Sequence, residues 1–420
     1  MKQYKIIFCL LYIWLPAMLC TGCGEATRKE AASVSYAAAG MENTPVINYV
    51  VPEVFPNILV NQEGYLAKGR KEATVKGKEL PKQFRLVNAE TEETVYTGFI
   101  KDAMYNEELD IYIGNAVFTD FTGEGVFFLE CDKIGRSLNF VLDDRMYYDL
   151  FQESYGDLME ACRQQTIEME DLVALLTVYE WYPEIFTDED ADEIPDVLEE
   201  IAKWIALKEE SGEQNDSDSM YVAVLAKFSY IYQRYDVRYA TECLQRASGI
   251  FAQRKELAGR DAEKFLALTE LYRTSGMSTY RNQIRDYTDF FEKNSSFMEE
   301  VAYLYGAMTY MATRQTVDVE LCNTFMERLM TRAEEVSERY EDMIHPVTAK
   351  NNGSNDLLKR VRELAYANYV LKNYQYTNIM EAFLNYLCGE NKDSLCYYVE
   401  EESRLEYIFL LAQLAAIYKE

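Results

Sequence analysis

Histidine is almost absent from this chain of 420 residues, in which His345 is the only one. Six cysteines follow Cys23, and no two of them have the C-x-x-C spacing. Structural zinc sites use four Cys or His ligands, usually in such closely spaced pairs. The sequence therefore argues against a zinc centre. It also shows no compact carboxylate cluster that demands another metal, so we expect neither a metal nor a cofactor.

Positive charge is also scarce. The chain has 42 Lys and Arg residues against 71 Asp and Glu, which gives a formal net charge of -29 at pH 7. Nucleic acids and anionic membrane surfaces would be repelled by such a molecule, so we exclude both as partners. A neutral ligand such as a polysaccharide would not be repelled. A solvated acidic surface explains the charge excess equally well, so charge alone identifies no partner.

The chain does not have the composition of a disordered protein, because 49% of its residues are hydrophobic and 14% are aromatic. Its length is sufficient for two or three domains, each with its own core.

The N-terminus has the pattern of an export signal. Lys2 and Lys5 precede an apolar run, Ile6 to Leu19, that is short for a membrane-spanning helix. The following Cys20-Thr-Gly-Cys23 resembles a bacterial lipobox, which implies lipidation of Cys23. Cys20 departs from that pattern, and ordinary signal cleavage is the alternative. We expect residues 1–23 to be a lipoprotein-type signal peptide. The protein would then be a cell-surface lipoprotein of a bacterium, in contact with the membrane only through its anchor.

Residues 24–56 are rich in Ala, Ser, Glu and Thr without a sustained period, which predicts a flexible tether. Residues 57–144 contain short apolar runs separated by Gly, Asp, Asn or Lys, which predicts a small β-sandwich.

From residue 146 to residue 420 the apolar residues recur with the period of an α-helix. About eleven segments, one of them Tyr280 to Phe291, with short connections between them predict an array of helical hairpins. The fold class is thus β followed by all-α.

The cysteines after Cys23 are scattered through apolar segments, which favours buried free thiols. Only Cys388 and Cys396 are close enough in sequence for a local disulfide, which stays an alternative.

Several motifs recur in the order found in one family. They are ILVNQEGY (58–65), TDFTG (119–123), LLTVYE (175–180), IPDVLEEI (194–201), YDVRYA (235–240), LTELYRTSG (268–276), GSN (353–355) and LNYLCGEN (384–391). Together they resemble glycoside hydrolase family 9 cellulases that carry an N-terminal immunoglobulin-like (Ig-like) domain. The resemblance implies an Ig-like β-sandwich followed by an (α/α)6 barrel. It implies inverting hydrolysis of β-1,4-glucan, in which one carboxylate activates water and a second carboxyl group protonates the leaving oxygen. Calcium sites occur in relatives.

The catalytic residues of that family are poorly matched. The family's G-W-x-D-A-G-D motif, which supplies the base, is missing before LLTVYE. An ungapped match places Asp157 and Glu160 on its two aspartates, whereas a deletion leaves both as solvated carboxylates of the first helix. The acid falls on Glu401, next to Glu402, just before the last helix, although an acidic helix N-terminus explains this run as well. The family's P-H-H-R sugar-binding segment is absent.

Three hypotheses follow. The protein is a monomeric endoglucanase of the family 9 type, a relative that has lost hydrolysis and retains at most binding of a polysaccharide such as β-glucan, or a cell-surface scaffold that binds protein. Because the base motif is missing, we favour the second.

Overall fold

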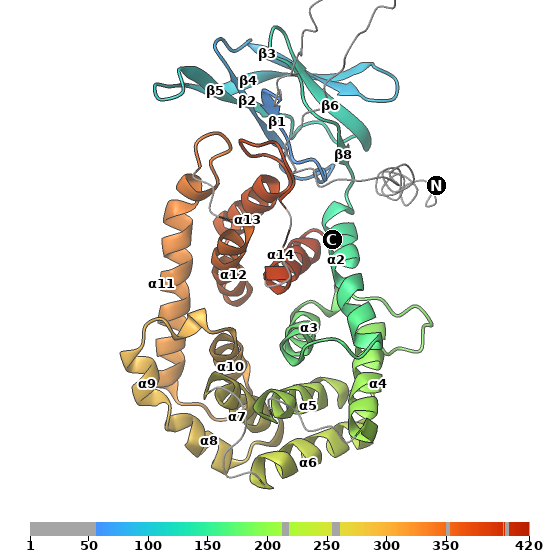
Figure 1. The fold of residues 1–420 in the computed structure, drawn as a ribbon, viewed down its shortest axis with the longest axis vertical. Coiled ribbons are helices and arrows are strands. Elements are labelled where there is room, and N and C mark those ends of the chain that lie inside the picture. Colours follow the sequence, from blue (N-terminus) through green and yellow to red (C-terminus); the bar gives the residue numbers. More distant parts are fainter. Residues whose placement is uncertain are drawn as a thin grey trace, which may run out of the picture. The chain divides into compact units, whose positions relative to one another are not determined.

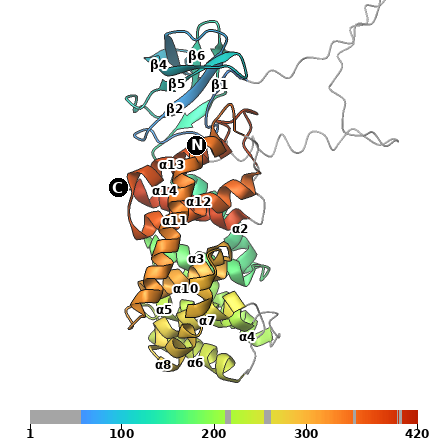
Figure 2. The same cartoon turned by 90° about the vertical axis from the view of Figure 1, so that its left-hand side faces the viewer.

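The computed structural model describes residues 56–211, 218–253, 261–349, 353–397, 399 and 403–419. The predicted signal peptide with Cys23, nearly all of the predicted tether, and Glu401 lie outside these residues. Strands are grouped in the first part of the described chain and helices in the remainder (Figures 1 and 2).

The first part is an antiparallel β-sandwich, as the sequence predicts. Its strands are β1 (Ile58–Leu59), β2 (Glu72–Gly77), β3 (Gln83–Asn88), β4 (Thr94–Asn106), β5 (Ile111–Val117), β6 (Gly125–Cys131), β7 (Gly135–Arg136) and β8 (Phe140–Leu142). Their order is β1-β2-β5-β4-β3-β6-β7, and β8 pairs with β6. The long strand β4 belongs to both layers, because its first half pairs with β3 and its second half with β5. The register shifts between Lys101 and Met104, as at a β-bulge.

Alternating side chains explain the sandwich core. In β3, Phe84 and Leu86 are buried, whereas Arg85 between them reaches Glu130 on β6. Tyr65 lies between the strands with its ring edge against Phe118 and Phe140, at centroid distances of 5.5 and 5.4 Å. The tyrosine of the ILVNQEGY motif is therefore a core residue.

The second part is a helical barrel. Its helices are α2 (Met146–Arg163), α3 (Met169–Trp181), α4 (Asp196–Ser211), α5 (Asp218–Tyr232), α6 (Val237–Gln253), α7 (Asp261–Ser275), α8 (Ser278–Arg285), α9 (Thr288–Lys293), α10 (Val301–Ala312), α11 (Val319–Ile344), α12 (Ser354–Val370), α13 (Tyr374–Leu387) and α14 (Arg404–Ile417), with short 3-10 turns η1 (Pro183–Ile185) and η2 (Phe297–Glu299). None of these helices is both long and apolar enough to cross a bilayer.

Inner and outer helices alternate along the chain (Figure 1). The inner helices α3, α5, α7, α10, α12 and α14 are buried over most of their surface, whereas an outer helix such as α6 buries only the stripe Ala240, Cys243 and Ala247. Helices that are apolar all round belong in an interior, and amphipathic helices cover it. Because alternate helices of successive hairpins run in the same direction, the inner helices all begin at one end of the barrel.

One segment differs from its prediction. The sequence period predicts a single helix from Tyr280 to Phe291, but the chain forms α8 and α9 with a break at Asp286 and Tyr287. The break turns Phe291 into an aromatic cluster, where its ring lies 4.8 Å from that of Phe265 and 4.7 Å from that of Phe297. Tertiary packing here outweighs the local helical period.

Residues of the ILVNQEGY motif connect the sandwich to the last turn of α13 and to the loop after it. Asn61 donates through Nδ2 to Asn385 Oδ1 at 2.8 Å, and the Gln62 backbone N–H donates to the Cys388 carbonyl oxygen at 2.8 Å. The Gln62 side-chain amide donates to the Ser394 carbonyl oxygen at 2.8 Å. Gly389 has φ +117°, and a Cβ there would lie 2.3 Å from Gln62 Nε2, so only glycine permits this approach. The motif and LNYLCGEN thus meet in space.

Candidate functional site

A cavity of about 510 Å³ lies where four inner helices begin. It is lined by residues at the start of α3, α10 and α14, by residues of the first three turns of α12, and by Arg332 of α11: Glu170, Glu299, Glu300, Val301, Tyr305, Arg332, Asp356, Lys359, Arg360, Arg362, Glu363, Leu405, Glu406 and Phe409. This volume falls within the range of ligand pockets in proteins. The cavity is therefore the candidate binding site at the mouth of the barrel.

Ion pairs with arginine fix the carboxylates of Glu363 and Glu406 in this cavity. Arg362 donates through Nη1 to Glu406 Oε1 at 2.8 Å, with both side chains buried. Arg332 lies 3.2 Å from Glu363 and 3.5 Å from Glu299. Burial raises the pKa of Glu363, and the nearby Arg332 opposes that rise. The buried Arg362–Glu406 pair and the partly exposed Arg332–Glu363 pair present hydrogen-bond donors and acceptors to the cavity.

Aromatic rings close the cavity on the barrel side. Phe409 of α14 lies 6.0 Å from Tyr305 of α10 and 5.2 Å from Tyr366 of α12, measured between ring centroids. Trp181 at the end of α3 lies 5.0 Å from Tyr366 and 5.7 Å from Phe409. These rings pack against one another inside the barrel, and Tyr305 and Phe409 form part of the cavity wall.

The sequence-predicted base candidates lie elsewhere. Asp157 and Glu160 are exposed on the outer helix α2 and are not among the cavity-lining residues. Glu160 accepts hydrogen bonds from Gln164 and Arg163, which lower its pKa. Helix α2 continues to Arg163, and residues 164–168 alone connect it to α3. Glu401 is not described, but it comes shortly before Arg404, where α14 begins to line the cavity.

Asp171, which belongs to none of the recognised motifs, has an unusual environment. It lies in the first turn of α3, and burial raises its pKa to about 6, against the opposing charge of Arg404. An acidic residue at a helix start is common, so the sequence alone carried no signal that this one would be partly buried.

Two glutamates of the family-like motifs form ion pairs inside the helical domain. Glu180 of LLTVYE lies near the end of α3, and Glu270 of LTELYRTSG lies in α7. Both contact Lys227 of α5 and Arg273 of α7. Lys227 Nζ lies 3.0 Å from Glu180 and 3.2 Å from Glu270, and Arg273 lies 2.5 Å from each glutamate. These motifs therefore mark an ion cluster that joins α3, α5 and α7.

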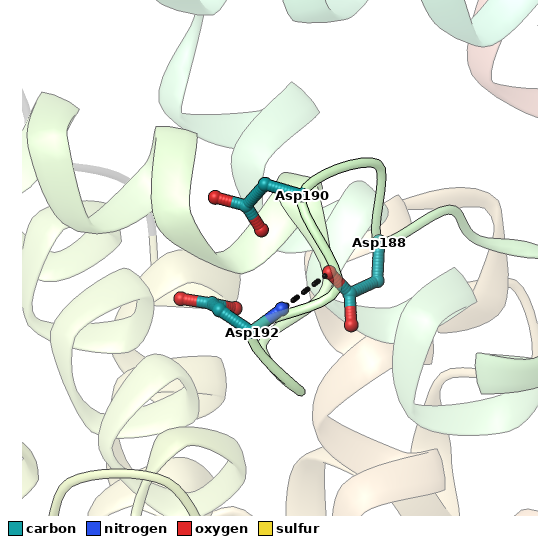
Figure 3. Close-up of side chains that lie close together, drawn as sticks. All are labelled: Asp188, Asp190 and Asp192. Carbon is teal, nitrogen blue, oxygen red and sulfur yellow. Dashed lines mark hydrogen bonds between the residues drawn. The ribbon is translucent and has the colours of Figure 1, made fainter.

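One group of acidic side chains could hold a cation. Asp188, Asp190 and Asp192 in the loop before α4 have carboxylate oxygens within 4.8 Å of one another (Figure 3). Asp188 already accepts hydrogen bonds from the backbone N–H groups of Asp192 and Glu193 at 3.2 and 3.0 Å. The turn itself thus accounts for the position of Asp188, while Asp190 and Asp192 are exposed.

Comparison with known proteins agrees with the architecture. Residues 53–136 match the family model described as the cellulase N-terminal Ig-like domain. A metagenome-derived glycoside hydrolase family 9 endoglucanase is 17% identical with a TM-score of 0.66, over 81% of this chain and 84% of that one. A Bacteroides ovatus protein of family 9 is 14% identical with a TM-score of 0.63, over 87% of this chain and 100% of the other. A thermostable endoglucanase from Alicyclobacillus acidocaldarius is 16% identical with a TM-score of 0.62, over 81% and 83% of the two chains. No curated protein matches the chain.

The chain therefore has an N-terminal domain that matches the cellulase Ig-like model, followed by a helical domain with the (α/α)6 fold of these solved structures, and its likeness to family 9 is a likeness of fold. Both the predicted family resemblance and the predicted fold class are confirmed.

Proposed function

We propose that this protein binds β-glucan at the mouth of its helical barrel and does not hydrolyse it. In this proposal the protein is exported, is anchored to the bacterial cell surface through a lipid on Cys23, and acts there as a monomer without a metal or cofactor.

The observation that carries the proposal is the short connection between α2 and α3. Inverting hydrolysis needs a base carboxylate about 6.5 to 9.5 Å from the acid, across the sugar. The family's base motif would belong immediately before α3, where residues 164–168 alone follow Arg163. Asp157 and Glu160, the remaining base candidates, are exposed on α2 and do not line the cavity. We infer that the deletion removed the base.

Binding of a neutral glycan is compatible with the chemistry of the cavity. Arginine–carboxylate pairs such as Arg362–Glu406 offer fixed hydrogen-bond donors and acceptors to sugar hydroxyls. A net charge of -29 does not repel a neutral chain. The solved structures with the same fold include endoglucanases, which makes β-glucan the first ligand to test.

Affinity electrophoresis in gels that contain soluble β-glucan tests the binding. We expect the wild-type protein to be retarded, and Lys359→Ala to bind about tenfold more weakly, because it removes an exposed ammonium donor from the cavity. Lys372→Ala is the matched control, since Lys372 is exposed just beyond the opposite end of α12. Retardation should persist in EDTA. Equal loss in both variants, or no retardation of the wild type, would contradict the proposal, and the latter would favour a protein-binding scaffold.

Release of reducing sugar from the same β-glucan tests the loss of hydrolysis. We expect no release above the protein-free background for wild type and for Glu401→Gln. If the wild type releases sugar and Glu401→Gln does not, hydrolysis is retained and Glu401 is its acid. If both release sugar equally, the assignment of Glu401 is wrong as well.

Metabolic labelling with a radioactive fatty acid in a bacterial host tests the anchor. We expect label on the wild type and on Cys20→Ala, and none on Cys23→Ala, because the lipid is attached to the new N-terminal cysteine. Label that survives Cys23→Ala would overturn the lipidation site. No label on any of the three proteins would favour ordinary signal cleavage.

A further inference from the structure

Two cysteines face each other in the loop that follows α13. Cys388 and Cys396 form an isolated antiparallel bridge, and the Tyr397 N–H donates to the Leu387 carbonyl oxygen at 2.7 Å beside it. This hydrogen bond joins the flanking residues, so Cys388 and Cys396 are a non-hydrogen-bonded pair. In such a pair the Cα atoms lie about 4.5 Å apart, at the short end of the roughly 4.4–6.8 Å that disulfides span.

The Cys396 thiol also lies close to the backbone of Cys388. Cys396 Sγ lies 3.2 Å from the Cys388 carbonyl oxygen. The remaining described cysteines lie on other elements, namely Cys131 on β6, Cys162 on α2, Cys243 on α6 and Cys322 on α11. Both cysteines of the pair are free thiols in the structure. Rotation about the side-chain bonds, without a change of backbone pairing, would bring the two sulfur atoms together.

The loop between these cysteines carries much of the contact with the sandwich. Gln62 bonds to it at both ends, through the Cys388 and Ser394 carbonyl oxygens. Glu390 accepts a hydrogen bond from Thr74 of β2 at 2.9 Å. Within the loop, Asn391 Nδ2 donates to the carbonyl oxygens of Tyr386 and Leu395, which holds the two sides together. A covalent link across the base of the loop would fix the same arrangement.

We propose that Cys388 and Cys396 are a disulfide site, oxidised by a small-molecule disulfide of the glutathione class, and that the bond locks the loop onto the β-sandwich. In the first step the Cys396 thiol loses its proton and its sulfur attacks the oxidant, which releases one glutathione thiolate and leaves a mixed disulfide. In the second step the Cys388 sulfur, after losing its proton, attacks Cys396 Sγ and releases the second glutathione. Both released thiolates take up the two protons, so one glutathione disulfide is reduced for each protein disulfide formed.

Exposure sets the order of these steps. Cys396 is exposed and Cys388 is buried, so the oxidant meets Cys396 first. Although the residue as a whole is exposed, its sulfur is partly surrounded by protein, and this partial burial raises the pKa of Cys396 to about 11, with a further contribution from Glu63. The thiolate fraction is therefore small at neutral pH, and the rate of oxidation should rise about tenfold for each pH unit below that pKa.

Incubation of the full chain with glutathione disulfide at mildly alkaline pH, followed by alkylation of free thiols and peptide mapping, tests the site. We expect Cys388 and Cys396 to be linked to each other, with a mass lower by two hydrogens than the reduced peptides. Cys322→Ser should retain this link and Cys396→Ser should lose it, and neither change removes a buried core thiol. Full alkylation of both cysteines after oxidation, or a link from either one to another cysteine, would overturn the site.

Hydrogen exchange tests the effect on the loop. The backbone N–H of Gln62 should exchange more slowly in the oxidised wild type than in the reduced protein, because the loop that supplies its acceptor opens less often. Glutathione disulfide should not change this rate in Cys396→Ser. An unchanged Gln62 rate in fully oxidised wild type would refute the locking role.

Discussion

At the scale of single residues, the molecule uses its buried carboxylates in different ways. Burial alone would raise the pKa of Glu180, but Lys227 and Arg273 outweigh burial and lower it to about 2. Glu180 is thus ionised and paired with both cations. A pair of this kind contributes little relative to apolar packing, but removal of one partner leaves an uncompensated buried charge.

Lys227→Met should therefore lower the free energy of unfolding by about 3–5 kcal/mol, because Glu270 loses one of its two cations in a fully buried position. The exposed Lys203→Met on α4 should change it by no more than about 0.5 kcal/mol. Urea unfolding at neutral pH measures both values. In the wild type, the contribution of Glu180 to the free energy of unfolding is complete above its unfolded pKa near 4.5, and it disappears as the pH falls toward 2. Equal stability of Lys227→Met and Lys203→Met would show that the cluster is not coupled.

The same residues show what sequence could predict. Glu180 and Glu270 belong to motifs that resemble those of family 9, yet their partner Lys227 lies outside every such motif. Their role depends on contacts between α3, α5 and α7, which periodicity does not specify. The position of Asp171 and the pairing of Arg362 with Glu406 likewise depend on which helix starts are neighbours in the ring.

At the scale of elements, sequence period was a good guide to the type of structure and a weaker one to its continuity. Helix α6 was predictable because its buried residues lie on one stripe, and β3 because the buried Phe84 and Leu86 alternate with the more exposed Gln83 and Arg85. The break between α8 and α9 was not, because it depends on Phe291 reaching Phe265 and Phe297 across the fold. The division of β4 between two layers was also invisible in its sequence.

The connection from α2 to α3 shows how an element can decide function. The sequence allowed two alignments for Asp157 and Glu160, one on the family's base motif and one within an uninterrupted helix. In the structure α2 is continuous through both residues. A helix directs these side chains by its own geometry, so neither can be placed in the cavity without unwinding the last turns of α2.

At the scale of the whole described chain, the contact between sandwich and barrel includes a carboxyl group that favours its protonated form. Burial raises the pKa of Glu390 to about 8, and the nearby Glu72 adds to this, whereas the hydrogen bond from Thr74 opposes it. Glu390 lines a cavity of about 400 Å³ together with Thr74 of β2 and Glu341 of α11. The protonated group serves as a neutral partner between the two domains.

This environment predicts a loss of stability with rising pH. The folded pKa of Glu390 is raised above its unfolded value near 4.5, so its stabilising contribution is complete below pH 4.5 and is lost as pH rises through about 8. Between these values the folded state binds the proton that the unfolded state has released, which lowers the free energy of unfolding by about 1.4 kcal/mol for each pH unit.

Urea unfolding of Glu390→Gln across this range should show a correspondingly smaller decline in the free energy of unfolding than wild type, because glutamine cannot ionise. Glu341→Gln, an exposed change beside the same cavity, should retain the wild-type slope. The slope difference between wild type and Glu390→Gln isolates this group from Asp171 and Glu363, whose pKa values are also raised. If the two slopes agree, Glu390 is already ionised in the folded protein over this pH range, and burial does not raise its pKa.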